Sequence, residues 1–250
     1  MLFVSKDSIV RKIWGKADTV LFIFAGSAAE FALNKAVDWL YFMGRLPADP
    51  IGRLFSTVAY AKQIIFSDES TALVAIGKIN SIHKTVEANR GAQIPDWAYR
   101  DVLFMLIDYS IRSFELLERT MTASEKEEVF RIFERVGHQM QIEDLPVNYT
   151  EWTKSREEHM RSDLMTSDFT RDLYRQYKKR LGPLRYLVLK QVQALLVPQP
   201  VNKLLGFKQT GVFTALLQAY KLLRALKLET VFNSILLPAK YKTQVHGLER

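Results

Sequence analysis

The sequence contains no cysteine. This absence excludes disulfide bonds, thiolate metal sites, iron–sulfur clusters and cysteine nucleophiles in a single step. Several enzyme motifs are missing as well: there is no Walker phosphate loop, no Gly-x-Gly-x-x-Gly, no nucleophile elbow and no His-Glu-x-x-His. The nucleotide-dependent, serine-hydrolase and zinc-peptidase chemistries that use these motifs therefore have no support in the sequence.

Long apolar runs of the kind found in signal peptides and membrane spans are also missing. Residues 1–14 have no continuous apolar core followed by small residues. Residues 20–33 form the most apolar early stretch, but this stretch is too short to span a bilayer and it contains Glu30. We therefore expect a cytoplasmic protein in which residues 20–33 form a buried helix.

The excess positive charge lies in the last quarter of the chain. Residues 1–182 contain 25 basic and 25 acidic side chains, whereas residues 183–250 contain 10 basic and 2 acidic ones. The basic residues are spread among leucines without a nucleic-acid-binding motif, so we expect no nucleic-acid partner. The block is suited to peripheral contact with a membrane or to packing against another helix. A solvated basic rim on ordinary helices is the alternative.

Apolar residues recur at helical spacing throughout the chain, and no stretch alternates as a strand would. The capping residues that we expect are Asp18, Asp49, Thr122 and Ser167. The predicted helices cover about residues 19–39, 50–66, 70–88, 96–119, 123–140, 149–163, 168–182, 184–196 and 212–226. No repeat, low-complexity tract or long linker is present, so we expect residues 1–250 to form a single all-α domain of about ten helices. A looser basic arm is expected over residues 228–250.

His83 is the most function-like histidine. It falls on one apolar helix face together with Ala72, Ile76, Ile79 and Val86, which puts its imidazole on the stripe expected to be buried. A buried imidazole needs a partner at each ring nitrogen. Hydrogen bonds from neighbouring helices are one arrangement, and an iron atom on one nitrogen with a carbonyl on the other is the second. The spacing alone favours the ordinary core histidine.

The histidines are not spaced as a zinc or di-iron site requires. No two of the four stand at metal-ligand spacing. The nearest helical Glu and His are Glu158 and His159, and adjacent side chains on a helix point in different directions. Di-iron bundles use two Glu-x-x-His units, and this chain has none. The sequence therefore gives little support to a zinc or di-iron centre.

Arg53 and Thr57 stand four residues apart on the helix that Asp49 and Pro50 are expected to open. An arginine there could hold a carboxylate such as a haem propionate, or polarise bound oxygen. The Thr57 hydroxyl could donate a hydrogen bond to an iron-bound ligand. The alternative is structural, with Arg53 paired to an acid and Thr57 bonded back to its own helix. Taken alone, the pattern favours the structural alternative.

Asp108 and Arg112 are also four residues apart, on a helix rich in Val, Leu, Met and Phe. The pair could be a half-buried ion pair or a surface one. Neither interpretation names a function.

Five segments, taken in order, resemble the family that groups the MpaB-type fungal oxygenases with the latex-clearing protein of rubber-degrading bacteria. The second segment has the pattern Pro-x-x-Arg-x-x-x-Thr, and the third carries His83. The segments are residues 21–30, 49–57, 79–86, 136–146 and 236–241. The resemblance covers about residues 20–245, which is nearly the whole chain.

The resemblance implies an all-α fold with a globin-like core around haem b. His83 would then be the proximal ligand of the iron, with Arg53 and Thr57 near the distal side. The implied activity is that of an oxygenase using O2 on an apolar, unsaturated or isoprenoid-like small molecule. Two alternatives stay open: a non-catalytic haem-binding sensor or carrier, and a cofactor-free helical interaction protein whose C-terminal region faces a membrane or a partner.

The chain departs from the family pattern at three places. Ser56 stands where the latex-clearing protein has a lysine, and residues 103–106 contain no histidine where many relatives have one. Residues 36–39 replace the His-Ser that commonly ends the first family helix. Asp38 is the neighbouring candidate for the acidic residue proposed as a base in rubber cleavage. These departures predict that rubber is not the substrate.

Overall fold

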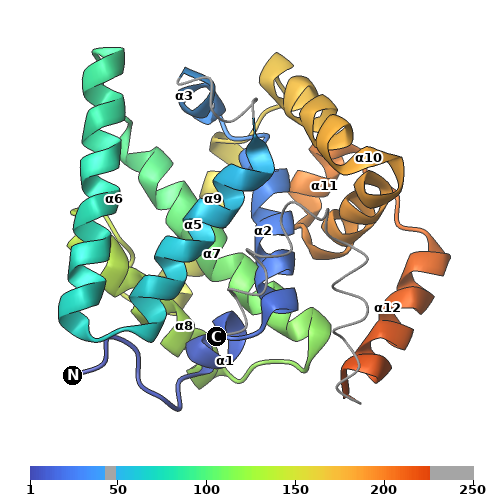
Figure 1. Cartoon of the computed structure of the whole chain (residues 1–250), viewed down its shortest axis with the longest axis horizontal. Coiled ribbons are helices and arrows are strands. Elements are labelled where there is room, and N and C mark those ends of the chain that lie inside the picture. Colours follow the sequence, from blue (N-terminus) through green and yellow to red (C-terminus); the bar gives the residue numbers. More distant parts are fainter. Residues whose placement is uncertain (43–48, 226–250) are drawn as a thin grey trace.

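The computed structural model describes residues 1–42 and 49–225, and within them the chain forms eleven α-helices and no β-strand. The predicted all-α fold is confirmed, and the helices form one domain (Figure 1). The helices are α1 (Ile9–Trp14), α2 (Ala17–Phe31), α3 (Val37–Phe42), α5 (Pro50–Phe66), α6 (Glu69–Arg90), α7 (Asp96–Leu117), α8 (Ala123–Gln139), α9 (Tyr149–Ser162), α10 (Asp168–Leu196), α11 (Gln199–Leu205) and α12 (Gly211–Ala225).

Side-chain caps set several of these boundaries where the sequence predicts them. The Asp49 carboxylate accepts a hydrogen bond from the Gly52 amide at 3.1 Å and opens α5. Thr122 and Glu125 form a reciprocal capping box at the start of α8, and the Ser167 side chain caps α10. Each cap satisfies an amide that has no partner within its own helix.

The expected stop at residue 182 is a sharp kink. Gly182 has φ 75° and ψ 170°, and Pro183 follows it inside α10. Proline removes one helical hydrogen bond and the left-handed glycine turns the chain, so the two halves of α10 point in different directions. Figure 1 shows this bend in the orange helix at the upper right.

The prediction of one helix over residues 19–39 is wrong in its second half. Helix α2 ends at Phe31, and α3 begins only at Val37. Between them the Lys35 amide donates to the Asp163 carbonyl at 2.9 Å, and the Met165 amide donates to the Leu33 carbonyl at 2.7 Å. These hydrogen bonds to a distant segment take the place of hydrogen bonds within a helix. No pattern within residues 19–39 predicts them.

Asp18 is not the cap of α2. Lys16 occupies that position, and Asp18 lies buried in the first turn. Its carboxylate pairs with Arg224 and accepts a hydrogen bond from the Tyr220 hydroxyl at 2.8 Å. This contact fastens α12 to the body of the molecule, where Leu217 also packs in a small apolar cluster. The predicted C-terminal arm, residues 228–250, lies outside the described residues.

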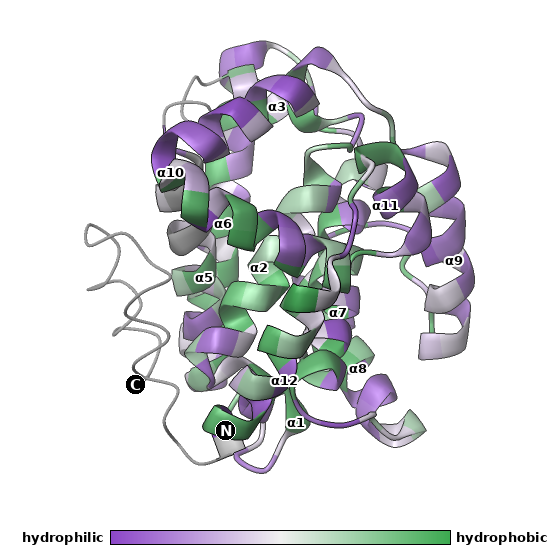
Figure 2. Cartoon of the chain, turned by 90° about the vertical axis from the view of Figure 1, so that its right-hand side faces the viewer, coloured by the Kyte–Doolittle hydropathy of each residue, from purple (hydrophilic) through white to green (hydrophobic). Residues whose placement is uncertain are grey.

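Helix α2 runs through the middle of the molecule, and Figure 2 shows it coloured mostly as hydrophobic. Its expected burial is confirmed, and Glu30 within it is 0% exposed. A Cβ added at Gly26 would stand 2.2 Å from the ring of Tyr109. Helices α2 and α7 therefore pack so closely here that only glycine fits at position 26. None of the helices in the described part of the chain is long and apolar enough to cross a membrane.

Helices α5 and α6 form an antiparallel hairpin joined at Ser67 and Asp68. The Asp68 side chain caps α6 by accepting a hydrogen bond from the Thr71 amide at 2.9 Å. The two helices pack against each other, and in Figure 1 they diverge as they leave this connection. Their far ends carry the residues that the sequence singles out.

Candidate functional site

His83 lies in the second half of α6, on the predicted apolar stripe. Ala72, Ala75 and Ile76 at the start of the stripe are buried, whereas Ile79 and His83 are half-buried. The stripe therefore opens towards solvent as the helix proceeds. His83 is therefore less enclosed than a core histidine would be.

The neighbour of His83 is an aromatic ring from α7. The centroids of the His83 and Tyr99 rings are 5.0 Å apart, with the planes inclined at 63°. The Tyr99 hydroxyl donates to a Glu87 carboxylate oxygen at 3.2 Å, and the Ile94 amide donates to the same oxygen at 2.9 Å. Burial and the Glu87 charge raise the pKa of Tyr99, so the phenol stays protonated as a donor. These bonds tie the end of α6 to the start of α7.

Arg53 and Thr57 lie at the same end of the hairpin as His83. The antiparallel arrangement sets the first half of α5 opposite the last part of α6. Thr57 is exposed on its helix. The backbone at Arg53 is helical, and its side chain lies outside the described part of the chain. The hairpin therefore places Arg53, Thr57 and His83 towards the same end of the molecule. It does not show whether their side chains touch.

Asp38, the neighbouring candidate base, is held in an ion pair. A carboxylate oxygen of Asp38 lies 2.6 Å from a guanidinium nitrogen of Arg90, the last residue of α6. The same guanidinium stacks 3.9 Å above the ring of Trp39. Arg90 thus fastens α3 to the end of α6, close to the open end of the hairpin.

A second polar cluster, which we term the buried network, lies between α2, α7 and α9. The Arg156 guanidinium donates to both carboxylate oxygens of Glu30, and also to Asp108 at 3.0 Å. The Tyr109 hydroxyl donates to Glu30 at 2.8 Å. Burial would raise the pKa of Glu30, but the Arg156 charge and the hydrogen bonds outweigh it and lower that pKa to about 2. Glu30 is therefore a fully paired buried carboxylate.

His159 extends the buried network towards the surface. Its Nε2 lies 3.2 Å from a Glu30 oxygen, and its Nδ1 faces both Asp101 and, at 3.2 Å, Asp163. Burial would lower the pKa of His159, but hydrogen bonds with Asp101 and Glu30 raise it to about 9. Without a further ligand, this imidazole carries a proton on each nitrogen at neutral pH.

The break between α2 and α3 supplies one more member of the buried network. The Asn34 side-chain amide donates to the second oxygen of Asp101 at 2.7 Å, while its own oxygen accepts from the Ala36 amide at 2.8 Å. Burial raises the pKa of Asp101, and the neighbouring charge of Asp163 adds to this effect. Asn34 therefore both ends the helix locally and orients a buried acid.

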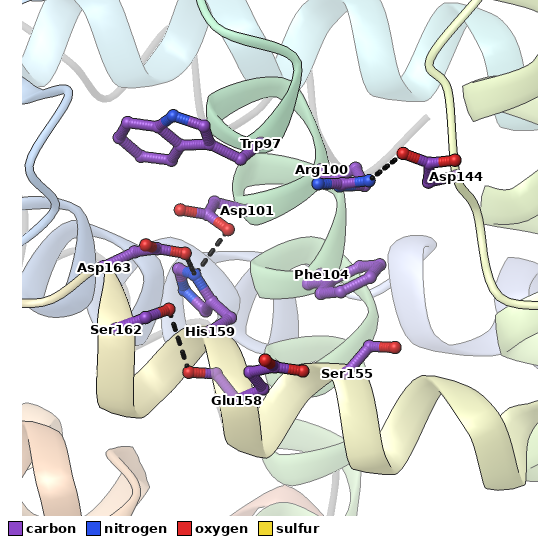
Figure 3. A pocket seen from close by; sticks show the side chains of 10 residues that line it. All are labelled: Trp97, Arg100, Asp101, Phe104, Asp144, Ser155, Glu158, His159, Ser162 and Asp163. Atoms are coloured by element: carbon purple, nitrogen blue, oxygen red, sulfur yellow. Dashed lines mark hydrogen bonds and ion pairs between the residues drawn. The ribbon is translucent and has the colours of Figure 1, made fainter.

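A pocket of about 380 Å³ opens onto this end of the buried network. Figure 3 shows Asp101, His159 and Asp163 grouped on one side of it, with Trp97 above them and Phe104 beside them. One ligand atom from each of the three grouped residues lies within 4.8 Å of the others. The pocket is thus polar at its base and partly aromatic on its walls.

The sequence pattern predicts some members of the buried network, but it does not predict that these residues contact one another. The ion pair between Asp108 and Arg112 exists at 2.7 Å and is half-buried. Arg156, the central cation, stands 126 residues from Glu30 and 48 from Asp108. The available signal was a charged residue inside an apolar helix, which requires a partner but does not say which one.

The chain matches, over residues 13–226, the family described as "ER-bound oxygenase mpaB/B'/Rubber oxygenase, catalytic domain". The all-α fold and this match together define the class as an oxygenase-type catalytic domain. Because the match covers most of its length, the chain belongs to this family, and the predicted resemblance is confirmed. No curated protein and no solved structure matches the chain.

Proposed function

We propose that this protein is a haem b-dependent oxygenase acting with O2 on an apolar small molecule, and that His83 is the iron ligand. Family membership supports the reaction class. The observation that carries the haem assignment is the half-buried imidazole of His83 on the apolar stripe of α6, beside an aromatic ring.

The other histidines are less suited to this role. His138 is exposed on α8, with Nε2 3.7 Å from Glu134, and both nitrogens of His159 face carboxylates. His246 lies outside the described residues. A porphyrin needs an axial nitrogen beside apolar and aromatic surface, and of the described imidazoles His83 has those surroundings. The donor chemistry at His83 therefore fits haem b.

Haem, when bound, would supply the O2-binding and redox chemistry. His83 would hold it from α6, within the globin-like core that the family resemblance implies. Arg53 would hold a propionate or donate hydrogen bonds to negative charge, and Thr57 would donate a second hydrogen bond. Apolar helical walls would orient an unsaturated or isoprenoid-like substrate and exclude water.

An absorption spectrum of protein expressed with ample haem tests the cofactor. We expect a Soret band that shifts with dithionite, is lost in His83→Ala and is kept in the exposed control His138→Ala. A colourless wild-type protein, or a band that survives in His83→Ala, would overturn the assignment.

Oxygen uptake tests the reaction. The reduced protein should consume O2 faster when an apolar alkene is added, and Arg53→Ala and Thr57→Ala should reduce this increase while keeping the Soret band. Ser56→Ala, a neighbour on the same helix, serves as the control. A rate of O2 consumption that does not change when the alkene is added would instead indicate a haem sensor or carrier.

The C-terminal quarter supports an added proposal of peripheral membrane contact. Residues 183–225 contain no acidic side chain, and Leu184, Val212 and Leu222 are each 69% exposed. Basic groups with exposed apolar side chains suit an anionic lipid surface. The protein should sediment with vesicles rich in phosphatidylserine and not with neutral phosphatidylcholine vesicles, and equal sedimentation with both would contradict the proposal.

A further inference from the structure

We propose that Asp101, His159 and Asp163 bind a divalent transition-metal ion, at a site separate from the iron site proposed at His83. The three residues come from α7, from α9 and from the position directly after α9. One imidazole nitrogen and two carboxylate oxygens form a donor set that suits zinc, manganese, iron or cobalt. Their ligand atoms already lie within 4.8 Å of one another.

Two carboxylates compete for a single ring nitrogen at this site. Asp101 Oδ1 and Asp163 Oδ2 both face Nδ1 of His159, with the second oxygen at 3.2 Å. Nδ1 can carry only one proton, so one N–H serves two negatively charged acceptors. A cation in place of that proton would be shared by all three ligand atoms, and the proton would leave to solvent.

The residues behind the ligands hold them in a binding orientation. Nε2 of His159 lies 3.2 Å from Glu30, which Arg156 fixes by donating to both of its oxygens. A metal-binding histidine characteristically donates its other N–H to a carboxylate in this way. Asn34 orients Asp101 by donating to the oxygen that does not face His159. Two of the three ligands are thus positioned by groups that would not touch the ion.

The pocket would let an ion reach the three ligands from solvent, and it would let a further ligand reach the bound ion. Asp101 and His159 are buried, whereas the Asp163 side chain is 22% exposed, so an ion would arrive from the Asp163 side. Three protein ligands leave coordination positions free for water or for a small anionic or carbonyl ligand. The cavity of about 380 Å³, with Trp97 and Phe104 on its walls, offers room for one.

The proposed metal site and His83 lie on different sides of α7. Tyr99 contacts His83, and Asp101, two residues later, contacts His159. Two residues on an α-helix are separated by about 200° around its axis. The two proposals can therefore fail independently of each other.

Calorimetric titration of the chelator-treated full chain with Zn²⁺ tests the site. We expect one ion per chain with a Kd tighter than about 10 μM. Asp163→Asn should weaken binding at least about tenfold, and Glu158→Gln, which removes another carboxylate lining the same pocket, should leave it unchanged. His83→Ala should bind Zn²⁺ normally, and Asp163→Asn should keep any Soret band.

Three results would overturn the proposal: no stoichiometric binding, equal affinity in Asp163→Asn, or an equal loss in Glu158→Gln. Far-UV circular dichroism checks that Asp163→Asn folds. If it does not fold, the visible spectrum of Co²⁺ added to the wild type decides. Bands of a nitrogen- and oxygen-ligated ion support the site, and the spectrum of aqueous Co²⁺ alone refutes it.

Discussion

The α5–α6 hairpin and the buried network hold their polar side chains in opposite ways. On the hairpin, His83 is half-buried beside the ring of Tyr99, and Thr57 is exposed. In the network, Glu30, Arg156 and His159 are at most 4% exposed, and Glu30 pairs with both of the other two. The hairpin thus carries partly exposed polar side chains, whereas the buried network holds charged side chains that are paired with one another.

This difference predicts where substitutions will cost folding stability. A half-exposed residue can be replaced at small cost in folding free energy, because water satisfies whatever it leaves behind. Removing one member of a buried ionic network leaves its partners charged and desolvated. Substitutions on the hairpin should therefore change the free energy of unfolding less than substitutions at the centre of the buried network.

The largest effect is expected at Arg156. Arg156→Ala leaves Glu30 and Asp108 buried without their main cation. We expect a loss of about 3–5 kcal/mol in the free energy of unfolding, measured by urea titration. Arg112→Ala, which removes the half-exposed partner of Asp108, should cost about 1 kcal/mol or less. Equal losses in the two variants would show that burial does not set the energetics of this network.

A pair of glycines compares the two regions directly. Gly26→Ala would drive a methyl group into the Tyr109 ring and should destabilise the protein by about 1–3 kcal/mol. Gly77→Ala on α6 meets nothing within 4 Å and should stabilise the protein by about 0.5–1 kcal/mol, through helix propensity. Shifts of the same sign in thermal unfolding would contradict the comparison.

His83→Ala should hardly affect folding, whatever it does to ligand binding. The variant loses the aromatic contact with Tyr99, and we expect the free energy of unfolding in urea to fall by about 0.5–1.5 kcal/mol without added haem. A loss as large as that of Arg156→Ala would mean that His83 is a structural core residue.

The smallest effect is a pH dependence at the start of α6. Hydrogen bonds from Ser70 and from the Thr71 amide lower the pKa of exposed Asp68 below its ordinary value of 3.8. Because the folded-state pKa is the lower one, the stabilisation is complete above pH 3.8 and is lost as the pH falls below it. Asp68→Asn keeps the cap without titrating, so its melting temperature should fall less on acidification. Identical pH profiles would refute this.

The sequence predicted the parts of the fold that depend on neighbouring residues. The caps at Asp49, Thr122 and Ser167 and the kink at Gly182 follow from short-range rules, and the structure confirms them. The end of α2 could not be predicted, because it depends on backbone bonds to residues 163–165. The spacing of residues within one segment does not predict hydrogen bonds to a segment about 130 residues away.

The same distinction between local patterns and distant contacts applies to the candidate sites. The apolar stripe of His83 is a local pattern, and the structure shows its first half buried as the spacing predicts. The sequence gives His159 no helical ligand partner, because its neighbour Glu158 points elsewhere. In the structure its partners Glu30, Asp101 and Asp163 come from α2, from α7 and from the position directly after α9. A histidine's surroundings follow from the tertiary fold, which a search for metal-ligand spacing within one helix does not represent.

The close crossing of α2 and α7 also constrains how sequences of this kind can diverge. A side chain larger than glycine at position 26 requires a smaller residue than tyrosine at position 109. That replacement would remove the hydroxyl that donates to Glu30 and leave this buried carboxylate to its bonds with Arg156 and His159. Among related chains, positions 26 and 109 should therefore vary together, and a larger residue at position 26 beside an unchanged tyrosine should be rare.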